Sequence, residues 1–547
     1  MLPSRPPSPV VFIASLLGLA ALPCAPEICL LVRNHEDLKY FAPVLYYEGI
    51  VSFLLLAPVL LLGRWGARIW VGSAGIVMGT ATLVTGFQAV SGGARWDPTA
   101  HAALLQTSPG EAAGFLRAFM SPATVGWSIL IVAGFAVGVA VNCRAVAPSR
   151  RVAGACLLGG LLFSSYGVHN AIKYTGDLRH AVSLSDGSQL QIIDVGINKF
   201  HPVTLLAVTH YNYQVTHDYY LRSFHAIDAH RAVFQGAHPV AGATNPRLVV
   251  VVIGESASRR HWSLYGYARD TTPELRRSGG DGVLFSDVIS SSVGTQAVLR
   301  SMFSTNFLAL PVFPLFSAAG YKTHWLSAQY NQGVNDVEIA ALLQSCDQRV
   351  FLNGAYDGSL LPFVRAAMDE PGRHVIFVNL FGSHVRYADR YPAEAAVFSG
   401  EGEKDGRIAT YDNSIRYTDH VLAELVRMLR ARHDASCLLY ASDHAEDVYD
   451  STPDTYLFRS EAIATNAMYE VPFYVWFSPE YREGNAAFVA GVAAARDRKF
   501  QTEALYHSII DLSRLTHPLY DSRLSVFSPD FVERPRRVGA MARVYTK

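Results

Sequence analysis

Charge is distributed very unevenly along this chain of 547 residues. Its first 172 residues contain 10 of the 46 basic residues and 6 of the 46 acidic ones, and are otherwise rich in apolar side chains. The rest of the chain has the charge content of an ordinary globular protein. The sequence therefore predicts a membrane anchor over residues 1–172, a connector over 173–246 and a soluble domain over 247–547. The formal net charge of zero argues against a nucleic-acid-binding protein.

The anchor is predicted to cross the membrane five times as helices, because a span of about 20 helical residues crosses the core of a bilayer. The five apolar stretches of that length are Pro9–Val32, Phe41–Gly63, Ile69–Val90, Gly126–Cys143 and Val152–Ala171. We expect the first stretch to be retained, because Leu22-Pro23-Cys24 lacks the small residues of a signal-peptide cleavage site.

The loops between these stretches predict the orientation of the chain. One set of very short loops carries Arg5, Arg64, Arg68, Arg144, Arg150 and Arg151, whereas acidic residues dilute the basic ones in the alternate loops. The positive-inside rule places the first set in the cytoplasm, and an odd number of spans then exports the soluble domain. Within the anchor, Glu27 and Glu48 are either functional intramembrane carboxylates or residues at the level of the outer headgroups.

Short apolar runs predict an α/β fold for the soluble domain. The runs at 247–253, 323–328, 375–381, 437–441 and 473–477 are typical of buried strands, and helical segments such as Arg416–Arg432 separate them. This alternation predicts a mainly parallel sheet covered by helices on both faces. Cys346 and Cys437 could form a disulfide in this domain, a question that their spacing leaves open.

Polar residues follow three of the predicted strands, at the edge where ligands of parallel sheets bind. These strand ends read Gly254-Glu255-Ser256, Gly382-Ser383-His384 and Ser442-Asp443-His444. Two carboxylates and two imidazoles at one edge form a candidate metal site with oxygen and nitrogen ligands. Taken singly, Asp443 could instead cap a helix and His444 could be a surface histidine.

A fourth segment places Thr295 at the expected start of a helix. Gly294 lets the backbone turn tightly before it. Free N–H groups at a helix start favour an anionic phosphoryl group. The commonest use of threonine at such a position is as a helix N-cap, and the spacing alone leaves both roles open.

Longer motifs run through the whole soluble domain. The first is Ser263–Pro273 (SLYGYARDTTP), and others are Tyr356-Asp357, Tyr411-Asp412-Asn413, Tyr417-Thr418-Asp419 and Met468–Phe473 (MYEVPF). Together with the strand ends and Gly294-Thr295, these motifs resemble the phosphoethanolamine transferases of Gram-negative inner membranes. Those enzymes belong to the alkaline phosphatase/sulfatase superfamily, and their five-span anchor agrees with the one predicted here.

The resemblance implies roles for particular residues. It implies that Glu255, Thr295, Asp443 and His444 hold a zinc ion, that Thr295 is the nucleophile that transiently carries phosphoethanolamine, and that His384 contacts the substrate phosphate. In the anchor, Gln106–Ala112 resembles a family loop that helps to hold the donor headgroup, so Thr107 and Glu111 are candidate substrate residues. A solvated loop helix is the alternative for that segment.

The chain also departs from the family pattern. Arg459 replaces a family histidine before the MYEVPF motif, and we expect it to keep a phosphate-binding cation there. Ala445 stands where many relatives have glycine. The cysteine pairs common in lipid-A-modifying members are absent, which favours the branch that acts on lipopolysaccharide core sugars.

The resemblance therefore predicts a monomeric enzyme of the bacterial inner membrane with its catalytic domain in the periplasm. Its donor would be phosphatidylethanolamine and its acceptor a lipopolysaccharide sugar (core heptose, Kdo or lipid A). The alternatives are a glycerophosphate-type transferase, a phosphatase or sulfatase, transfer to periplasmic glucans, and a membrane sensor with a degenerate domain. Thr295–Leu299 does not match the Cys/Ser-x-Pro-x-Arg segment of sulfatases. The intact set of predicted zinc ligands argues against the sensor.

Overall fold

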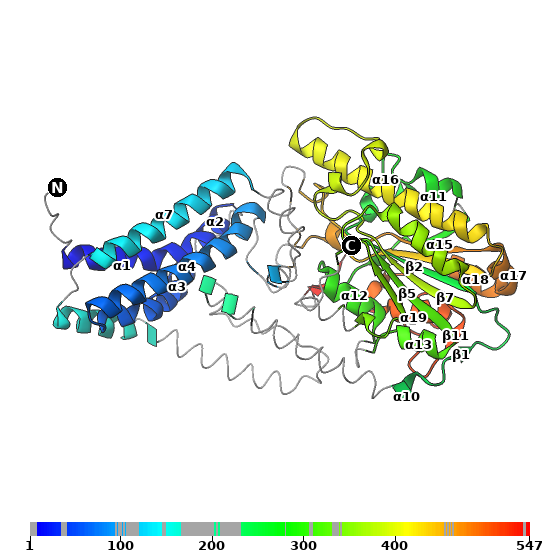
Figure 1. The fold of residues 1–547 in the computed structure, drawn as a ribbon, viewed down its shortest axis with the longest axis horizontal. Helices are drawn as coiled ribbons and strands as arrows, with labels where there is room; N and C mark the ends of the chain where they lie inside the picture. Colours follow the sequence, from blue (N-terminus) through cyan, green and yellow to red (C-terminus); the bar gives the residue numbers. More distant parts are fainter. Residues whose placement is uncertain are drawn as a thin grey trace. The chain divides into compact units, whose positions relative to one another are not determined.

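The computed structural model describes residues 8–33, 41–92, 120–144, 149–162, 231–278, 281–305, 310–330, 342–452, 464–539 and 543–546, and a few isolated residues between these ranges. The chain divides into two compact units (Figure 1). The first comprises Met1–Leu104 with Phe119–Val215, and the second comprises Leu105–Ala118 with Thr216–Lys547. Thr107 and Glu111 lie outside the described residues.

The first unit is helical. Its named elements are α1 (Pro9–Ala21), η1 (Leu22–Cys24), α2 (Ala25–Arg33), α3 (Phe41–Leu56), η3 (Ala57–Leu60), α4 (Arg64–Gly92) and α7 (Pro122–Arg144). Three helical segments in the described part of the chain are long and apolar enough to cross a membrane: Pro9–Val32, Arg64–Ser91 and Pro122–Arg144. These correspond to the first, third and fourth predicted spans.

The other two predicted spans are not established by the structure. The second is divided between α3 and η3, and its apolar helical part, Glu48–Leu60, is shorter than a bilayer requires. Pro58 in η3 lacks a backbone N–H and so interrupts the α-helical hydrogen bonds there. The fifth is helical over residues 150–162, and most of the rest of its predicted range lies outside the residues that the structure describes. A five-helix anchor therefore stays a prediction.

Both anchor carboxylates that the sequence singled out are buried within the first unit. The exposed fraction is 3% for Glu27 and 0% for Glu48. The two carboxylate oxygens of Glu48 have no hydrogen-bond partner among the described residues.

A seven-stranded sheet forms the centre of the second unit. Its order is β3 (Val283–Leu284), β9 (Phe473–Phe477), β8 (Ser436–Ser442), β2 (Leu248–Gly254), β7 (Arg373–Asn379), β5 (Tyr321–Ser327) and β6 (Gln348–Phe351). The pairs from β8 to β6 are all parallel, whereas β9 runs antiparallel to both β8 and β3. The sheet is therefore mixed, and all five predicted strands belong to it.

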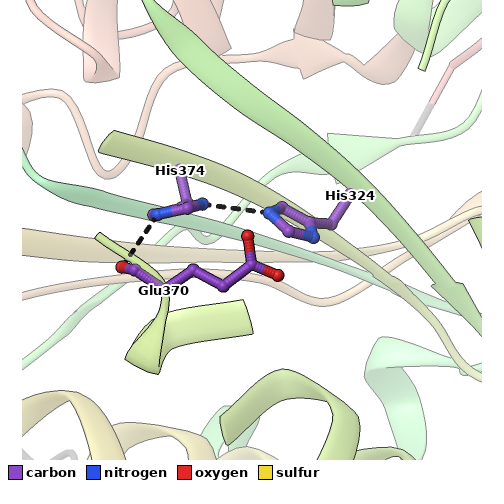
Figure 2. A group of neighbouring side chains, drawn as sticks. All are labelled: His324, Glu370 and His374. Carbon is purple, nitrogen blue, oxygen red and sulfur yellow. Dashed lines mark hydrogen bonds between the residues drawn. The ribbon is translucent and has the colours of Figure 1, made fainter. Parts of the chain in front are cut away.

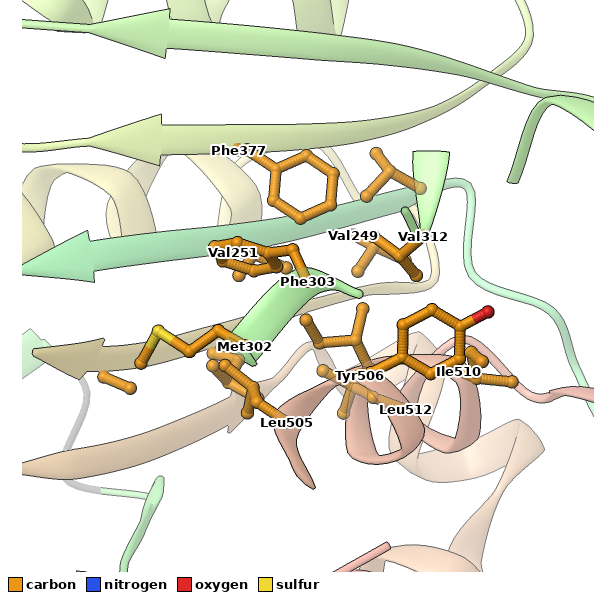
Figure 3. Packing of buried hydrophobic residues seen from close by; sticks show 14 of the residues in the cluster. Val249, Val251, Met302, Phe303, Val312, Phe377, Leu505, Tyr506, Ile510 and Leu512 are labelled. Carbon is orange, nitrogen blue, oxygen red and sulfur yellow. The ribbon is translucent and has the colours of Figure 1, made fainter. Parts of the chain in front are cut away.

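The continuous apolar sequence of β2 reflects burial on both faces of the sheet. Val249, Val251 and Ile253 pack into a core with α12 (Thr295–Phe303), α13 (Phe313–Ala318) and α19 (Leu505–Leu512), as Figure 3 shows for part of it. The alternate residues of β2 face a second core with α11 (Pro273–Ser278), α15 (Leu361–Asp369) and α16 (Gly402–Arg430) (Figure 1). The predicted covering of both faces by helices is confirmed.

The motif over 263–273 is held against α16 by two buried aspartates of that helix. Asp412 accepts hydrogen bonds from His261 Nδ1 at 2.6 Å, Arg269 Nη1 at 2.8 Å and the Tyr267 hydroxyl at 2.9 Å. Asp419 accepts from the backbone N–H groups of residues 274 and 275, at 2.7 and 2.8 Å, in the first turn of α11. These hydrogen bonds thus connect the segment that follows β2 to helix α16.

The buried pair of His261 and Asp412 makes stability depend on pH. Burial lowers the pKa of His261, but hydrogen bonds to Asp412 and Asp450 outweigh this and raise the pKa to about 9. Because the unfolded pKa is about 6.5, the stabilisation is complete below that pH and is lost as pH rises through about 9. Its size is roughly 3 kcal/mol. Denaturant unfolding of the full chain in detergent should show this loss between pH 6.5 and 9.5, and His261→Gln should remove it. An equal pH dependence in the variant would contradict the assignment.

Candidate active site

The register of the central strands brings the predicted ligands together. Strands β2 and β8 pair in parallel as far as Gly254↔Ser442, so the next residues, Glu255 and Asp443, lie side by side at the carboxyl edge of the sheet. One ligand atom from each of Glu255, Asp443 and His444 lies within 4.8 Å of the others, and all three side chains are buried. His444 Nε2 is 3.1 Å from Asp443 Oδ2 and 3.4 Å from Glu255 Oε1.

Thr295 points its hydroxyl into this cluster. Its Oγ1 donates to Glu255 Oε2 at 3.1 Å and lies 3.1 Å from His444 Nε2. Thr295 is the first residue of α12, and Gly294 occupies the N-cap position, so the alternative that Thr295 is the cap does not hold. The free N–H groups of the helix start therefore lie next to the hydroxyl, where they favour negative charge.

The backbone after β2 adopts an unusual conformation that fixes Glu255. Ser256 has φ of +60°, which is uncommon for any residue other than glycine. Its hydroxyl donates to Glu255 Oε1 at 2.6 Å, and its N–H donates to Asp443 Oδ1 at 3.1 Å. His444 N–H also donates to Asp443 Oδ1, at 2.7 Å, so that this oxygen binds two loop amides and does not cap a helix.

Sequence reasoning missed two side chains that position the site. Gln329, which follows β5, donates to Glu255 Oε2 at 3.3 Å and to the Leu380 carbonyl at 2.8 Å. Glu461 accepts from the Val293 N–H at 2.9 Å and so holds the loop before Thr295. Gln329 could have been found, because it too follows the carboxyl end of a parallel strand. Glu461 lies in a loop with no such signal.

The electrostatics of the cluster favour a bound cation. Burial raises the pKa of Asp443 well above its usual range, and the charge of Glu255 raises it further. Burial also raises the pKa of Glu255, but the basic groups of His444, His384 and Arg459, of which only Arg459 is charged at pH 7, outweigh it and lower the pKa to about 2. Burial lowers the pKa of His444, and Arg459 adds to this shift, so its ring is neutral. Two adjacent buried carboxylates and a neutral imidazole form a site that a cation would stabilise.

The donor set fits a zinc ion in particular. Asp443 Oδ2 is buried and makes no well-aligned hydrogen bond among the described residues, although His444 Nε2 lies 3.1 Å away, and a bound cation would satisfy this oxygen. Two carboxylates, one imidazole nitrogen and one hydroxyl provide four oxygen or nitrogen donors, the number that tetrahedral zinc takes. His444 is fully buried and is therefore not a surface histidine.

Arg459 contacts the imidazole ring of His444, one of the predicted zinc ligands. Its Nη1 lies 2.9 Å from His444 Nδ1 and donates to the Val293 carbonyl, also at 2.9 Å. Its Nε is 3.4 Å from Glu446 Oε1, and this buried carboxylate holds the guanidinium in place. Burial raises the pKa of Glu446 to about 7, an effect that Arg459 opposes. The structure therefore places Arg459 beside His444 and Glu446, and its predicted role in binding phosphate stays a prediction.

His384 lies in the loop after β7, and this loop passes close to Glu255. Asp357 accepts hydrogen bonds from the N–H groups of Phe381 and Gly382, at 2.6 and 2.9 Å, and fixes the loop. The His384 ring packs against Phe381 with 5.3 Å between ring centroids. Burial lowers the pKa of His384 to about 4, although Glu255 opposes the shift, so the ring is neutral at pH 7.

The backbone of Glu255 lies so close to Gly382 that replacing this glycine with alanine should strongly destabilise the fold. Gly382 has φ of +50°, and a Cβ there would lie 2.7 Å from the carbonyl oxygen and 2.9 Å from the nitrogen of Glu255. We expect Gly382→Ala to cost about 3 kcal/mol of unfolding free energy, from backbone strain and overpacking together. Gly320→Ala is the matched control, because Gly320 has φ of +82° but no atom within 4 Å of a Cβ. Equal losses of unfolding free energy in both variants would show that contact with the Glu255 backbone contributes nothing at Gly382.

The two cysteines of the second unit are both free and buried, so the possible disulfide between Cys346 and Cys437 is absent. Burial raises the pKa of Cys346 to about 12. Neither thiol is therefore reactive at neutral pH.

Comparison with known sequences agrees with this site. Residues 247–514 match the sulfatase family model. The phosphoethanolamine transferase EptC of Escherichia coli K12 is 31% identical over 322 residues, which cover 54% of this chain and 55% of the relative. The phosphoethanolamine transferase CptA of Salmonella typhimurium gives the same identity and coverage. The chain thus matches about half the length of these curated relatives.

Solved structures give the same result. The zinc complex of the C-terminal periplasmic domain of E. coli EptC is 29% identical, with a TM-score of 0.52, and the match covers 56% of this chain and 92% of that one. The integral membrane protein EptA of Neisseria meningitidis shares the fold, with a TM-score of 0.68 at 18% identity over 98% of this chain and 99% of the other. The resemblance predicted from the motifs is confirmed: residues 247–514 match the sulfatase family model, and the chain is similar to phosphoethanolamine transferases over about half its length.

Proposed function

We propose that this chain transfers phosphoethanolamine from phosphatidylethanolamine to a sugar of lipopolysaccharide. The observation that carries the proposal is the position of Thr295, whose hydroxyl lies 3.1 Å from both Glu255 Oε2 and His444 Nε2 at the start of a helix. A hydroxyl so placed is a nucleophile directed at a site for anionic groups. The relatives named above are phosphoethanolamine transferases, which supports this group as the one transferred.

The reaction has two balanced halves. In the first, Thr295 Oγ1 attacks the phosphorus of the donor, a Thr295–phosphorus bond forms, and the bond from phosphorus to diacylglycerol oxygen breaks. The threonine proton ends on diacylglycerol. In the second half, a sugar hydroxyl attacks the same phosphorus, the Thr295–phosphorus bond breaks, and the proton of the sugar hydroxyl ends on Thr295 Oγ1. A covalent intermediate lets one site serve two lipids in turn.

The residues around Thr295 provide charge and position for both halves. Glu255, Thr295, Asp443 and His444 would hold zinc, which when bound supplies Lewis acidity that lowers the pKa of a ligated hydroxyl. The guanidinium of Arg459 and the first N–H groups of α12 offer positive charge to the phosphoryl oxygens. His384 lies on the loop beside Glu255 and would contact the substrate phosphate as a neutral donor. Zinc in the E. coli EptC domain supports this choice of metal.

The anchor fits a lipid donor. We propose five spans with residues 247–547 in the periplasm and the anchor in the inner membrane, which agrees with the description of the EptC domain as periplasmic. Thr107 and Glu111 would contribute to binding of the donor headgroup, Glu111 by pairing with its ammonium. A relative of 26% identity, the Kdo(2)-lipid A phosphoethanolamine 7''-transferase of E. coli, supports a lipopolysaccharide sugar as acceptor.

Headgroup transfer in a defined system tests this function. The purified full chain would be given phosphatidylethanolamine labelled in its headgroup, with and without purified lipopolysaccharide. We expect label on lipopolysaccharide, an equal amount of diacylglycerol, and little free phosphoethanolamine. Label released only as free phosphoethanolamine with lipopolysaccharide present would establish a hydrolase instead. No consumption of this donor, but consumption of phosphatidylglycerol, would favour the glycerophosphate transferase.

A further inference from the structure

A second cluster of metal-ligating side chains lies at the amino-terminal edge of the sheet (Figure 2). His324 belongs to β5, His374 belongs to β7, and Glu370 lies just before β7. His374 pairs in register with Leu248 at the start of β2, whereas Glu255 follows the end of that strand. At about 3.3 Å per strand residue, the two clusters are roughly 20 Å apart. This cluster is therefore separate from the site that contains Thr295.

The two imidazoles face each other through ring nitrogens. His324 Nε2 lies 3.0 Å from His374 Nδ1, and the other nitrogen of His374, Nε2, donates to the Glu370 carbonyl at 3.1 Å. In a neutral ring, that donation leaves the lone pair of His374 Nδ1 directed at His324. A histidine that donates one N–H to a backbone carbonyl and presents its other nitrogen is the usual arrangement of a metal-bound histidine.

The cluster has the protonation states and spacing that a metal ion needs. Both rings are fully buried. Burial lowers the pKa of His324 to about 4 and also lowers that of His374, so both rings are neutral donors at pH 7. One ligand atom from each of the three residues lies within 4.8 Å of the others. Two nitrogens on a tetrahedral zinc ion are about 3.3 Å apart, close to the 3.0 Å between His324 Nε2 and His374 Nδ1.

The carboxylate of Glu370 is the third candidate ligand, and because it is partly exposed, an ion could reach it from solvent. Its side chain is 33% exposed, and its Oε2 accepts a hydrogen bond from Lys322 Nζ at 2.6 Å. Lys322 thus neutralises the carboxylate when no ion is present, and a bound ion would compete with it.

We propose that His324, Glu370 and His374 form a second site for a divalent transition-metal ion, most simply zinc, which ties β5 to β7 and displaces Lys322 from Glu370. Two imidazoles and one carboxylate are a ligand set that zinc, cobalt and nickel accept, with open positions for water. The site is independent of the proposed transfer reaction.

Cobalt(II) binding to the full-length protein in detergent tests the proposal. The background is the double variant Glu255→Ala, Asp443→Ala, which removes the candidate active-site ligands. We expect this background to bind one equivalent of cobalt in equilibrium dialysis, with the visible absorption of a four-coordinate ion. Adding Glu370→Gln, which replaces a partly exposed side chain and should leave the fold intact, is expected to weaken binding by at least about 10-fold.

Two further variants separate a ligand site from a general effect of charge or folding. Lys322→Gln should strengthen cobalt binding, because it removes the competitor for Glu370. His420→Gln should change nothing, because His420 contacts Glu274 outside the cluster. A background that binds no cobalt, or binding that Glu370→Gln and His374→Gln both leave unchanged, would overturn the proposal.

Discussion

Thr295→Ala is expected to lower phosphoethanolamine transfer by about 10⁴-fold or more, the usual result of removing a nucleophile that forms a covalent intermediate. The Thr295 hydroxyl lies 3.1 Å from both Glu255 Oε2 and His444 Nε2. Alanine leaves no oxygen there to attack phosphorus. The measurement is the initial rate at which labelled headgroup reaches lipopolysaccharide, with wild-type and variant protein loaded with zinc in the same way.

Two controls accompany this prediction. Thr295→Ser keeps the oxygen and should retain a readily measured fraction of the wild-type rate. Thr295→Ala itself should still bind zinc, because the three other ligands remain, so its loss of activity would not reflect an empty site. A rate for Thr295→Ala within 10-fold of wild type would show that another group forms the bond to phosphorus.

Asp443→Asn is expected to remove zinc from the candidate active site and abolish activity with it. Asp443 Oδ2 makes no well-aligned hydrogen bond in the described residues and lies 3.1 Å from His444 Nε2, so its buried carboxylate is best explained as a ligand that shares an ion with His444. Loss of one anionic ligand should weaken zinc binding by more than about 100-fold, since even partners outside the ligand shell contribute 10- to 100-fold. Elemental analysis after dialysis against a zinc buffer measures this directly, in a His374→Gln background that removes the second cluster.

Asp447→Asn is the matched control. Asp447 is as deeply buried as Asp443 and only four residues away, but its Oδ1 accepts from the N–H groups of Asp450 and Ser451, at 2.8 and 3.1 Å. Its replacement should perturb this loop and leave zinc bound. Equal zinc loss in the two variants would mean that Asp443 acts by folding the loop and is not a ligand.

Much of the soluble domain could be predicted because its strands are buried on both faces. A continuous apolar run such as Leu248–Ile253 is typical of a strand buried on both faces of a sheet. Because neighbouring strands pair in parallel, the residues that follow each strand lie at the same edge of the sheet. That single rule found Glu255, His384, Asp443 and His444. It would also have found Gln329 if the end of the strand at Tyr321–Ser327 had been examined for polar residues.

The features that escaped prediction depend on contacts between distant segments. The helix α16 begins at Gly402, well before the predicted Arg416, and the polar residues Asp412, Asn413 and Ser414 of this earlier part are buried, with Asp412 bound to Arg269 of the 263–273 segment. The left-handed backbone of Ser256 is imposed by Asp443 and Glu255, and no local preference of serine signals it. The short strands β3 and β6 have only two and four residues, too few for a hydrophobic pattern.

Intact-mass spectrometry of the zinc-loaded full chain, given phosphatidylethanolamine without acceptor, tests the central claim most directly. The result expected is one added phosphoethanolamine per chain, located on Thr295 by fragmentation, removed by lipopolysaccharide, and absent from Thr295→Ala. Consumption of the donor with no gain in mass at any time, or an adduct on a different residue, would contradict the claim.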